Sequence, residues 1–347
     1  MSRTIMVHKA DMQKDKEMLN TADGKLIFTE YQGKKCALLI SDNRLIAASF
    51  YGKRGSKIGG IYIGKVKNVV KNLDAYFVEI AGGEICFLPG KEAKAPYILN
   101  RTFDGRILES DEVLVQVTKD AHKTKQASVS CNLKCDDMDA LIQIAAHRTC
   151  FTCLQSPKPE WQRILDTLVS EDEYAEIITD DKALYEEMLT HEDCISQNIR
   201  FYEDRQFALT KLYSVENKMD TALNARIWLK SGAYLVIEQT EALTVIDVNS
   251  GKYDAKKASD EMFYQINREA ASEIALQLRL RNLSGIIIVD FINMKSKELQ
   301  KELLEKLREL VKCEKQLTRV IDMTPLGLVE ITRKKGNKTL AEQFKNA

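Results

Sequence analysis

The chain has 347 residues, of which 44% are hydrophobic and 29% charged, a composition typical of a folded globular protein of roughly two or three domains. Lys plus Arg and Asp plus Glu balance at 51 each, so the whole chain is not a polycation and any nucleic-acid surface must be a local patch. No apolar stretch approaches the roughly 18 residues of a membrane span, and the N-terminus lacks the apolar run of a signal peptide. We therefore expect no membrane span and a cytoplasmic location, where cysteines stay reduced.

The first half of the chain begins with a polar stretch, residues 1–24, which we interpret as an N-terminal extension. Residues 25–58 continue with strand patterns, and Gln32-Gly33 between two of them predicts a β-hairpin. Residues 59–129 contain several short strands, with a tight turn predicted at Gly82-Gly83. Short strands at this density predict a small β-barrel such as the OB-fold.

The second half changes from a mixed pattern to a regular alternation. Residues 130–220 combine short helix and strand patterns. In residues 221–347 strands alternate with helices, which predicts a layered α/β domain. The expected strands cover residues 232–238, 242–248, 286–290 and 328–332, and the expected helices cover residues 259–280 and 297–312.

Two apolar, β-branched strands of this last region end in aspartate. Asp247 closes the run Leu-Thr-Val-Ile-Asp, and Asp290 closes the run Ile-Ile-Ile-Val-Asp. Two strand-end carboxylates on neighbouring strands could hold Mg²⁺ against a phosphate. Asn249 would share a face with Asp247, because strand side chains alternate with a period of two. The alternative is that these aspartates only cap the following loops.

Aromatic and basic residues suggest where a single-stranded nucleic acid could bind. Phe77 and Phe87 lie on strands of the expected barrel, where exposed rings would stack on bases, although a Phe on a strand is more often part of the core. Arg333 and Lys334 follow the last strand and could face a phosphate backbone, or could belong to a solvated tail.

Four cysteines are clustered in the sequence, with three residues between the first two and two residues between the last two. Two close pairs of thiols suggest a structural zinc site, but the first spacing is unusual and no Gly or Pro favours tight knuckles. Reduced, partly buried thiols are the favoured alternative, so zinc is not expected. The four residues are Cys131, Cys135, Cys150 and Cys153.

Three segments resemble the ribonuclease E/G family. Residues 227–251 read IWLKSGAYLVIEQTEALTVIDVNSG, residues 275–294 read ALQLRLRNLSGIIIVDFINM, and residues 326–335 read LGLVEITRKK. This similarity covers about residues 210–336 and is highly specific. The barrel also resembles the family's OB-fold RNA-binding domain, and residues 25–58 resemble part of its split RNase H-like subdomain.

The resemblance implies both a fold and an activity. The fold would be α/β, or α+β overall: an OB-fold inserted in an RNase H-like subdomain, followed by a DNase I-like catalytic domain at residues 221–347. The activity would be a magnesium-dependent endoribonuclease, with manganese as a substitute, acting on single-stranded RNA in rRNA or tRNA processing or mRNA decay. Asp247 and Asp290 would hold the metal, Asn249 would complete the catalytic set, and Phe77, Phe87 and Lys125 would grip RNA.

Three departures from the family pattern qualify these expectations. The region at residues 130–220 is shorter than in the family, and the residues flanking Arg148-Thr149 do not match its 5′-phosphate sensor. The sequence ends before a CPxC zinc-link, so we expect no zinc-linked tetramer, whereas a homodimer formed through other surfaces agrees with the sequence. Asn293 stands where the family usually has Asp.

A non-catalytic RNA-binding paralogue is therefore the rival hypothesis. The retained aspartates argue against it, because buried carboxylates without a metal would repel RNA and cost stability. A structural role tied to zinc at the clustered cysteines is a third, weaker alternative.

Overall fold

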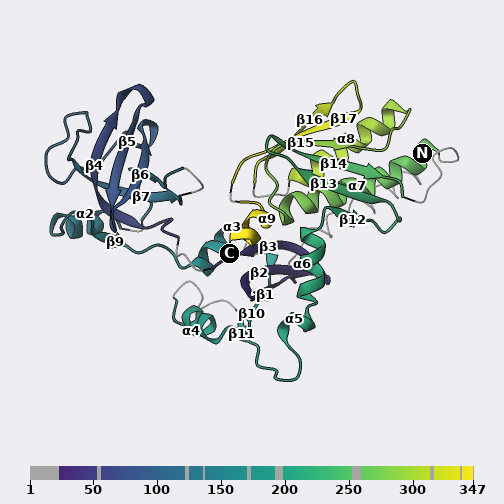
Figure 1. Ribbon diagram of the computed structural model, residues 1–347, viewed down its shortest axis with the longest axis horizontal. Helices are drawn as coiled ribbons and strands as arrows, with labels where there is room; N and C mark the ends of the chain where they lie inside the picture. Colours follow the sequence, from purple (N-terminus) through teal and green to yellow (C-terminus); the bar gives the residue numbers. More distant parts are fainter. Residues whose placement is uncertain are drawn as a thin grey trace. The chain divides into compact units, whose positions relative to one another are not determined.

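The structure, a computed structural model, describes residues 23–52, 56–121, 125–135, 137–169, 173–191, 198–251, 259–312, 316–336 and 338–346 (Figure 1). Nearly all of the expected N-terminal extension lies outside these residues. The chain divides into two compact units: Arg54–Arg163 forms one, and Met1–Lys53 together with Ile164–Ala347 forms the other. None of the described helices has the length and apolar character needed to cross a membrane.

The larger unit begins with a five-stranded sheet, called here the first sheet. Within the described residues its strand order is β11-β10-β1-β2-β3. β1 pairs antiparallel with β2 and parallel with β10, and the barrel unit is inserted between β3 and β10. This is the expected split RNase H-like arrangement. The strands are β1 (Lys25–Tyr31), β2 (Lys34–Ser41), β3 (Arg44–Phe50), β10 (Glu176–Thr179) and β11 (Ile199–Phe201).

Local sequence explains the hairpin that opens this sheet. Gln32 and Gly33 have φ values of 50° and 72°, the left-handed pair that a two-residue hairpin turn requires. Ile27 and Leu38 are fully buried in the core of this sheet, which also contains Leu280 and Leu340 from later helices. The surrounding helices are α4 (Lys182–Thr190), α5 (Leu209–Leu212), α6 (Val215–Leu223) and α9 (Leu340–Asn346), and α3 (Glu160–Leu168) precedes β10.

The smaller unit is the expected OB-type barrel. Its strands are β4 (Ile61–Val70), β5 (Ala75–Ile80), β6 (Glu84–Pro89), β7 (Glu112–Lys119), β8 (Ser128–Ser130) and β9 (Cys153–Gln155). In this part of the described chain the order is β5-β6-β8-β7-β4-β9, and β4 also pairs with β5, which closes the barrel. Gly64 on β4 allows this closure, because a Cβ there would lie 2.5 Å from Val78 Cγ1.

The barrel unit extends beyond residue 129, where we expected its end. β9 pairs with β4, and Ala145 of α2 (Met138–Ala146) joins a small core with Ile63 and Leu114 of the barrel. Much of the region expected to form a shortened sensor therefore belongs to the barrel unit, and the remainder completes the first sheet.

The second sheet carries the strand-end aspartates. Its described strands have the order β12-β13-β14-β15-β17-β16, in which only β14 and β15 pair in parallel. The strands are β12 (Arg226–Trp228), β13 (Tyr234–Gln239), β14 (Leu243–Asn249), β15 (Gly285–Asp290), β16 (Thr318–Met323) and β17 (Leu328–Arg333). The helices are α7 (Asp260–Leu280) and α8 (Lys297–Lys312).

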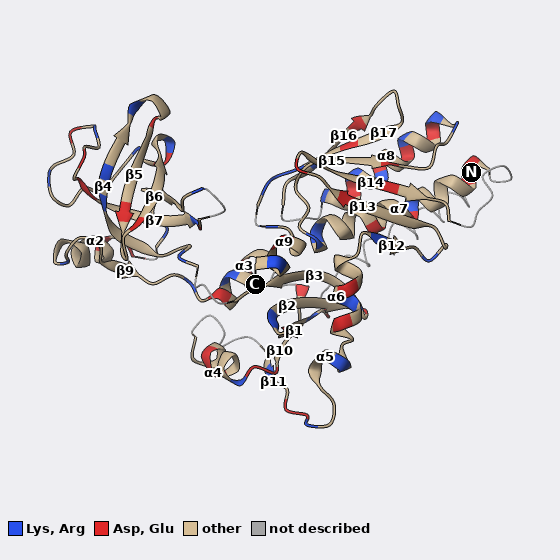
Figure 2. Ribbon diagram, viewed as in Figure 1, with Lys and Arg blue, Asp and Glu red and all other residues tan. Residues whose placement is uncertain are grey.

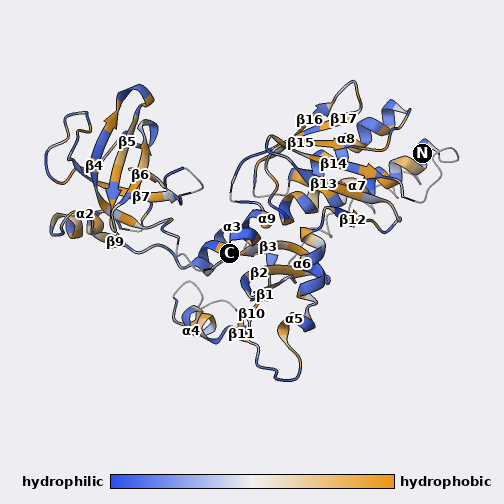
Figure 3. Ribbon diagram, in the orientation of Figure 1, coloured by the Kyte–Doolittle hydropathy of each residue, from blue (hydrophilic) through white to orange (hydrophobic). Residues whose placement is uncertain are grey.

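One face of the second sheet is covered and the other is open. Ile246 and Ile287 are fully buried in a core that includes Ile274 of α7 and Leu307 of α8. The alternate positions face solvent, and Ile286 is 52% exposed. We call this second side the open face. Hydrophobic residues are frequent in these strands and charged residues recur along α8 (Figures 2 and 3), whose buried positions are all Leu or Val.

Candidate active site

Asp247 and Asp290 occupy directly paired positions on the parallel strands β14 and β15. Both are exposed, and both lie on the open face because their neighbours Ile246 and Val289 point into the core. Neighbouring strands are about 4.8 Å apart, so the two carboxylates can share one cation. The expectation that these two carboxylates are buried, and would therefore cost stability without a metal, is wrong because both are exposed.

Asn249 is linked to this pair. Its Nδ2 donates a hydrogen bond of 2.7 Å to Oδ2 of Asp247, from the same face of β14. The amide therefore orients the carboxylate, as expected from the spacing of two residues.

A close approach of two backbones shapes the end of β14. Gly251 has φ of 66°, and a Cβ at this position would lie 2.2 Å from the carbonyl oxygen of Gly232. Only glycine fits between the chain leaving Asn249 and the β12–β13 turn. The Asp-Val-Asn-Ser-Gly run is thus constrained at both its polar and its glycine positions.

Asn267, which sequence patterns did not single out, holds the chain leaving Asp290. Asn267 lies fully buried on α7; its Nδ2 donates to the carbonyl of Ile292 at 2.8 Å, and its Oδ1 accepts from the Ile292 amide at 3.0 Å. This double hydrogen bond fixes the backbone two residues beyond Asp290. The available signal was a polar side chain on the apolar face of an amphipathic helix.

Asn293, the departure from the family pattern, is exposed next to the turn before β17. A Cβ at Gly327 would lie 3.2 Å from its Oδ1. It is therefore near the Asp290 end of β15, because Asp290 pairs with Leu328.

Of the two basic residues expected to contact RNA, Arg333 faces inward. It is 5% exposed, and its Nη1 donates to Asn282 Oδ1 at 3.1 Å and to the Leu283 carbonyl at 2.8 Å. Strand alternation places it on the covered face with Ile331. We assign Arg333 a structural role, whereas Lys334 is exposed.

The two barrel aromatics form a pair outside the barrel core. Phe77 and Phe87 are cross-strand partners on β5 and β6, with ring centroids 5.9 Å apart at 61°. Both are half-buried, while their neighbours Val78 and Cys86 fill the core. Lys125 is exposed and lies two residues before Ala127. The Ala127 carbonyl accepts a hydrogen bond from the Phe87 amide at 2.7 Å, so the segment that follows Lys125 contacts Phe87.

The clustered cysteines are not gathered into a metal site. Throughout the part of the chain that the structure describes, no group of three or more His, Cys, Asp or Glu side chains is placed to hold a metal ion. Cys131 is 3% exposed, and burial raises the pKa of its thiol to about 12. Cys153 is exposed and its Sγ donates to the Gln155 carbonyl at 3.3 Å.

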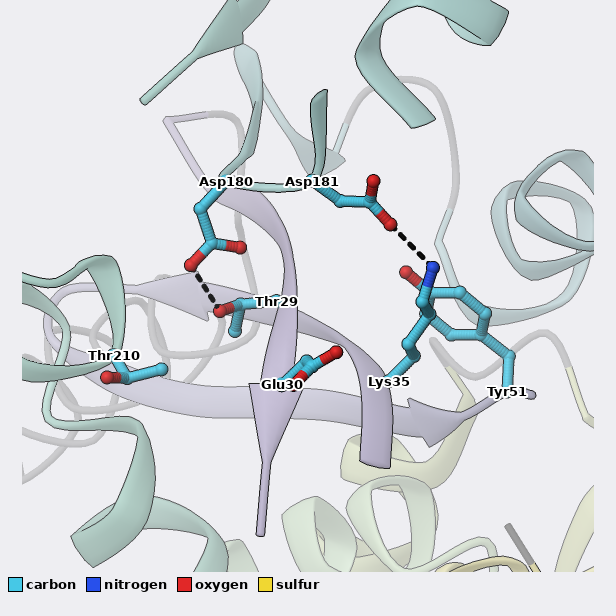
Figure 4. A pocket seen from close by; sticks show the side chains of 7 residues that line it. All are labelled: Thr29, Glu30, Lys35, Tyr51, Asp180, Asp181 and Thr210. Atoms are coloured by element: carbon cyan, nitrogen blue, oxygen red, sulfur yellow. Dashed lines mark hydrogen bonds and ion pairs between the residues drawn. The ribbon is translucent and has the colours of Figure 1, made fainter. Parts of the chain in front are cut away.

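A polar cavity of about 580 Å³ is lined mainly by residues of the first sheet and of the segments that follow its strands (Figure 4). Thr29 Oγ1 donates to Asp180 Oδ2 at 2.9 Å, and Lys35 Nζ contacts Asp181 Oδ2 at 2.6 Å. Burial raises the pKa of the Asp180 carboxyl, although its side chain keeps contact with solvent. The other lining residues are Glu30, Tyr51 and Thr210, so the cavity includes neither Asp247 nor Asp290.

Comparisons with known proteins point to one family. The model of the Ribonuclease E/G family matches residues 112–336. Ribonuclease G of Salmonella typhimurium (strain SL1344) is 27% identical over an alignment of length 363, gaps included; the alignment covers 82% of this chain and 74% of that protein. Ribonuclease G of Haemophilus influenzae and ribonuclease E of Nostoc sp. are each 42% identical over 146 residues; these cover 42% of this chain and 30% and 21% of the two proteins.

Proposed function

Since the chain belongs to the ribonuclease E/G family, we propose that it is an endoribonuclease that hydrolyses single-stranded RNA with the help of a divalent metal. The pairing of Asp247 with Asp290 on the open face carries this proposal. Two exposed carboxylates suit magnesium, which binds proteins through few carboxylates and keeps several waters; manganese would substitute.

The residues of this chain would hold and orient the reacting groups. When bound by Asp247 and Asp290, the metal would polarise the phosphate and lower the pKa of water. Asn249 would keep the Asp247 carboxylate in position through its 2.7 Å hydrogen bond. Hydrolysis would form a bond from water oxygen to phosphorus and break the bond to the 3′ oxygen, which takes up a proton. The products would carry a 5′-phosphate and a 3′-hydroxyl.

The barrel would supply much of the RNA affinity. Phe77 and Phe87 offer ring surface to bases, and stacking contributes about 1–3 kcal/mol per base. Lys125 offers an exposed charge to a phosphate. These contacts are tolerant of sequence, which fits a role in RNA processing or decay in which many single-stranded segments are bound.

The rival function is RNA binding without cleavage, and Asn293 is the observation that favours it. Exposed carboxylates facing RNA without a metal would repel phosphates, so retention of the pair favours hydrolysis. The two functions differ in one readout, the appearance of metal-dependent cleavage products.

The test uses a 5′-labelled, A/U-rich single-stranded RNA with magnesium or with EDTA. We expect cleavage by the wild type in magnesium, none in EDTA, and none by Asp290→Asn. Asp322→Asn is the matched control, because Asp322 is an exposed carboxylate on the edge strand β16. Binding without cleavage by the wild type would refute hydrolysis and support the rival.

A further inference from the structure

Two aromatic side chains and one arginine stand beside the carboxylate pair on the open face. Trp228 is 61% exposed, although tryptophan is usually well buried. Its ring centroid lies 5.1 Å from that of Tyr234, with an angle of 55° between the planes. The Arg226 guanidinium lies 4.7 Å from the Tyr234 ring centroid.

Strand register connects this group to the proposed active site. Trp228 pairs with Tyr234, which pairs with Asn249 on β14. In the adjacent row Arg226 pairs with Val236, which pairs with Asp247. The two rows therefore run side by side across β12, β13 and β14.

The face follows from the alternation of burial. Ile227 is 5% exposed and Leu235 is fully buried, and both belong to the core beneath α7 and α8. Their neighbours Arg226, Trp228 and Tyr234 consequently share the open face with the carboxylates. Two strand spacings separate β12 from β14, about 10 Å, which a short stretch of extended RNA spans.

The chemistry of the group suits a nucleotide. In the described part of the chain the Arg226 guanidinium makes no ion pair with a carboxylate, so its charge is available to an anion. Exposed Trp and Tyr rings stack on bases, and arginine contacts phosphates and adds a cation–π interaction. A positive charge and flat apolar surface two strands from Asp247 complement the ligand that the active site would hold.

We propose that Arg226, Trp228 and Tyr234 form a subsite for a nucleotide flanking the scissile phosphate, in which a base stacks on Trp228 and Arg226 contacts the RNA backbone. This inference rests on the proposed function, because it places the subsite beside the hydrolytic carboxylates. It adds binding residues within the α/β domain to those of the barrel.

Intrinsic fluorescence provides a direct test, because the chain has only two tryptophans. Trp161 is 2% exposed, and the variant Trp161→Phe leaves Trp228 as the one tryptophan of the chain, whose emission is excited selectively over that of tyrosine. We would titrate it in EDTA with a short, labelled A/U-rich RNA and record RNA anisotropy and tryptophan emission together. We expect emission to be quenched in step with binding. Binding without any change in Trp228 emission would overturn the subsite.

Variants then measure the contribution of the ring. Trp228→Ala should weaken RNA binding by roughly tenfold or more, and Trp228→Phe should retain most of the affinity. Ile286→Ala, which truncates another exposed apolar side chain of the same face, should leave the affinity within about twofold. Equal affinities of Trp228→Ala and wild type would refute the proposal.

Substrates with one abasic nucleotide locate the stacked base. The loss of cleavage efficiency caused by Trp228→Ala should disappear when the abasic position is the one that stacks on the ring. If the loss is the same for every abasic position, Trp228 does not bind a base.

The remaining outcomes separate this inference from the proposed function and from a protein partner. Quenching and affinity loss without cleavage by the wild type would refute hydrolysis and leave the subsite supported. Cleavage by the wild type without quenching would support hydrolysis and overturn the subsite. A lower molar mass for Trp228→Ala than for wild type in light scattering would show that a second copy covers the face, and would overturn the inference.

Discussion

The double hydrogen bond of Asn267 offers the sharpest test of how the fold positions Asp290. In Asn267→Ala, the amide and carbonyl of Ile292 lose their partners, which lie 3.0 Å and 2.8 Å away in the structure. Net hydrogen bonds contribute about 0.5–1.5 kcal/mol each, and an unsatisfied buried polar group costs about 1–3 kcal/mol. Because Ile292 keeps partial access to solvent, we expect a loss of about 2–4 kcal/mol in the free energy of unfolding.

Asn267→Ala should lower the cleavage rate by misplacing Asp290, and not by weakening RNA binding. The backbone that follows Asp290 would be released, so we expect lower kcat with little change in RNA affinity measured in EDTA. Urea unfolding gives the stability, and single-turnover cleavage at a temperature where the variant is folded gives the rate. Gln265→Ala is the matched control, since Gln265 is an exposed amide on α7 whose Nε2 donates a hydrogen bond to the nearby Glu261. A stability loss below about 0.5 kcal/mol with unchanged cleavage would refute the reasoning.

Four further predictions concern separate parts of the chain. Asp247→Asn should abolish cleavage in the labelled-RNA assay while RNA affinity in EDTA is kept; normal cleavage would remove Asp247 from the metal site. Phe77→Ala should weaken RNA binding by about 1–3 kcal/mol, and an unchanged affinity in an RNA titration would refute the stacking role of Phe77. Asp180→Asn should raise Tm at neutral pH. Burial raises the pKa of the Asp180 carboxyl in the folded state, so the wild type loses stability as pH rises through that pKa, whereas the neutral asparagine does not. Near pH ~3 the Asp180 carboxyl of the wild type is protonated and as neutral as the asparagine of the variant, so the gain in Tm should vanish. RNAs with a 5′-monophosphate or a 5′-hydroxyl should be cleaved at similar rates, since Arg148 lacks the flanking residues of a sensor; a strong monophosphate preference would contradict this.

Periodic patterns predicted the main elements well because burial and strand alternation act locally. The expected strands at 232–238, 242–248, 286–290 and 328–332 correspond to β13, β14, β15 and β17, and both long helices agree within a residue or so. The two edge strands β12 and β16 were missed. Each contains a single buried residue, Ile227 or Val320, so it carries little alternation of its own and gains stability from its neighbour in the sheet.

The amino-acid sequence by itself determined the acidic strand ends, the spacing of Asp247 and Asn249, and the family resemblance, because these are properties of contiguous segments. The tertiary structure alone decided which residues of different strands share a face. It brought Trp228, Tyr234 and Asn249 into one row across three strands, and it turned Arg333 inward to Asn282 and Leu283. Register between strands and partners across tens of residues depend on packing of the whole sheet, so no local pattern encodes them.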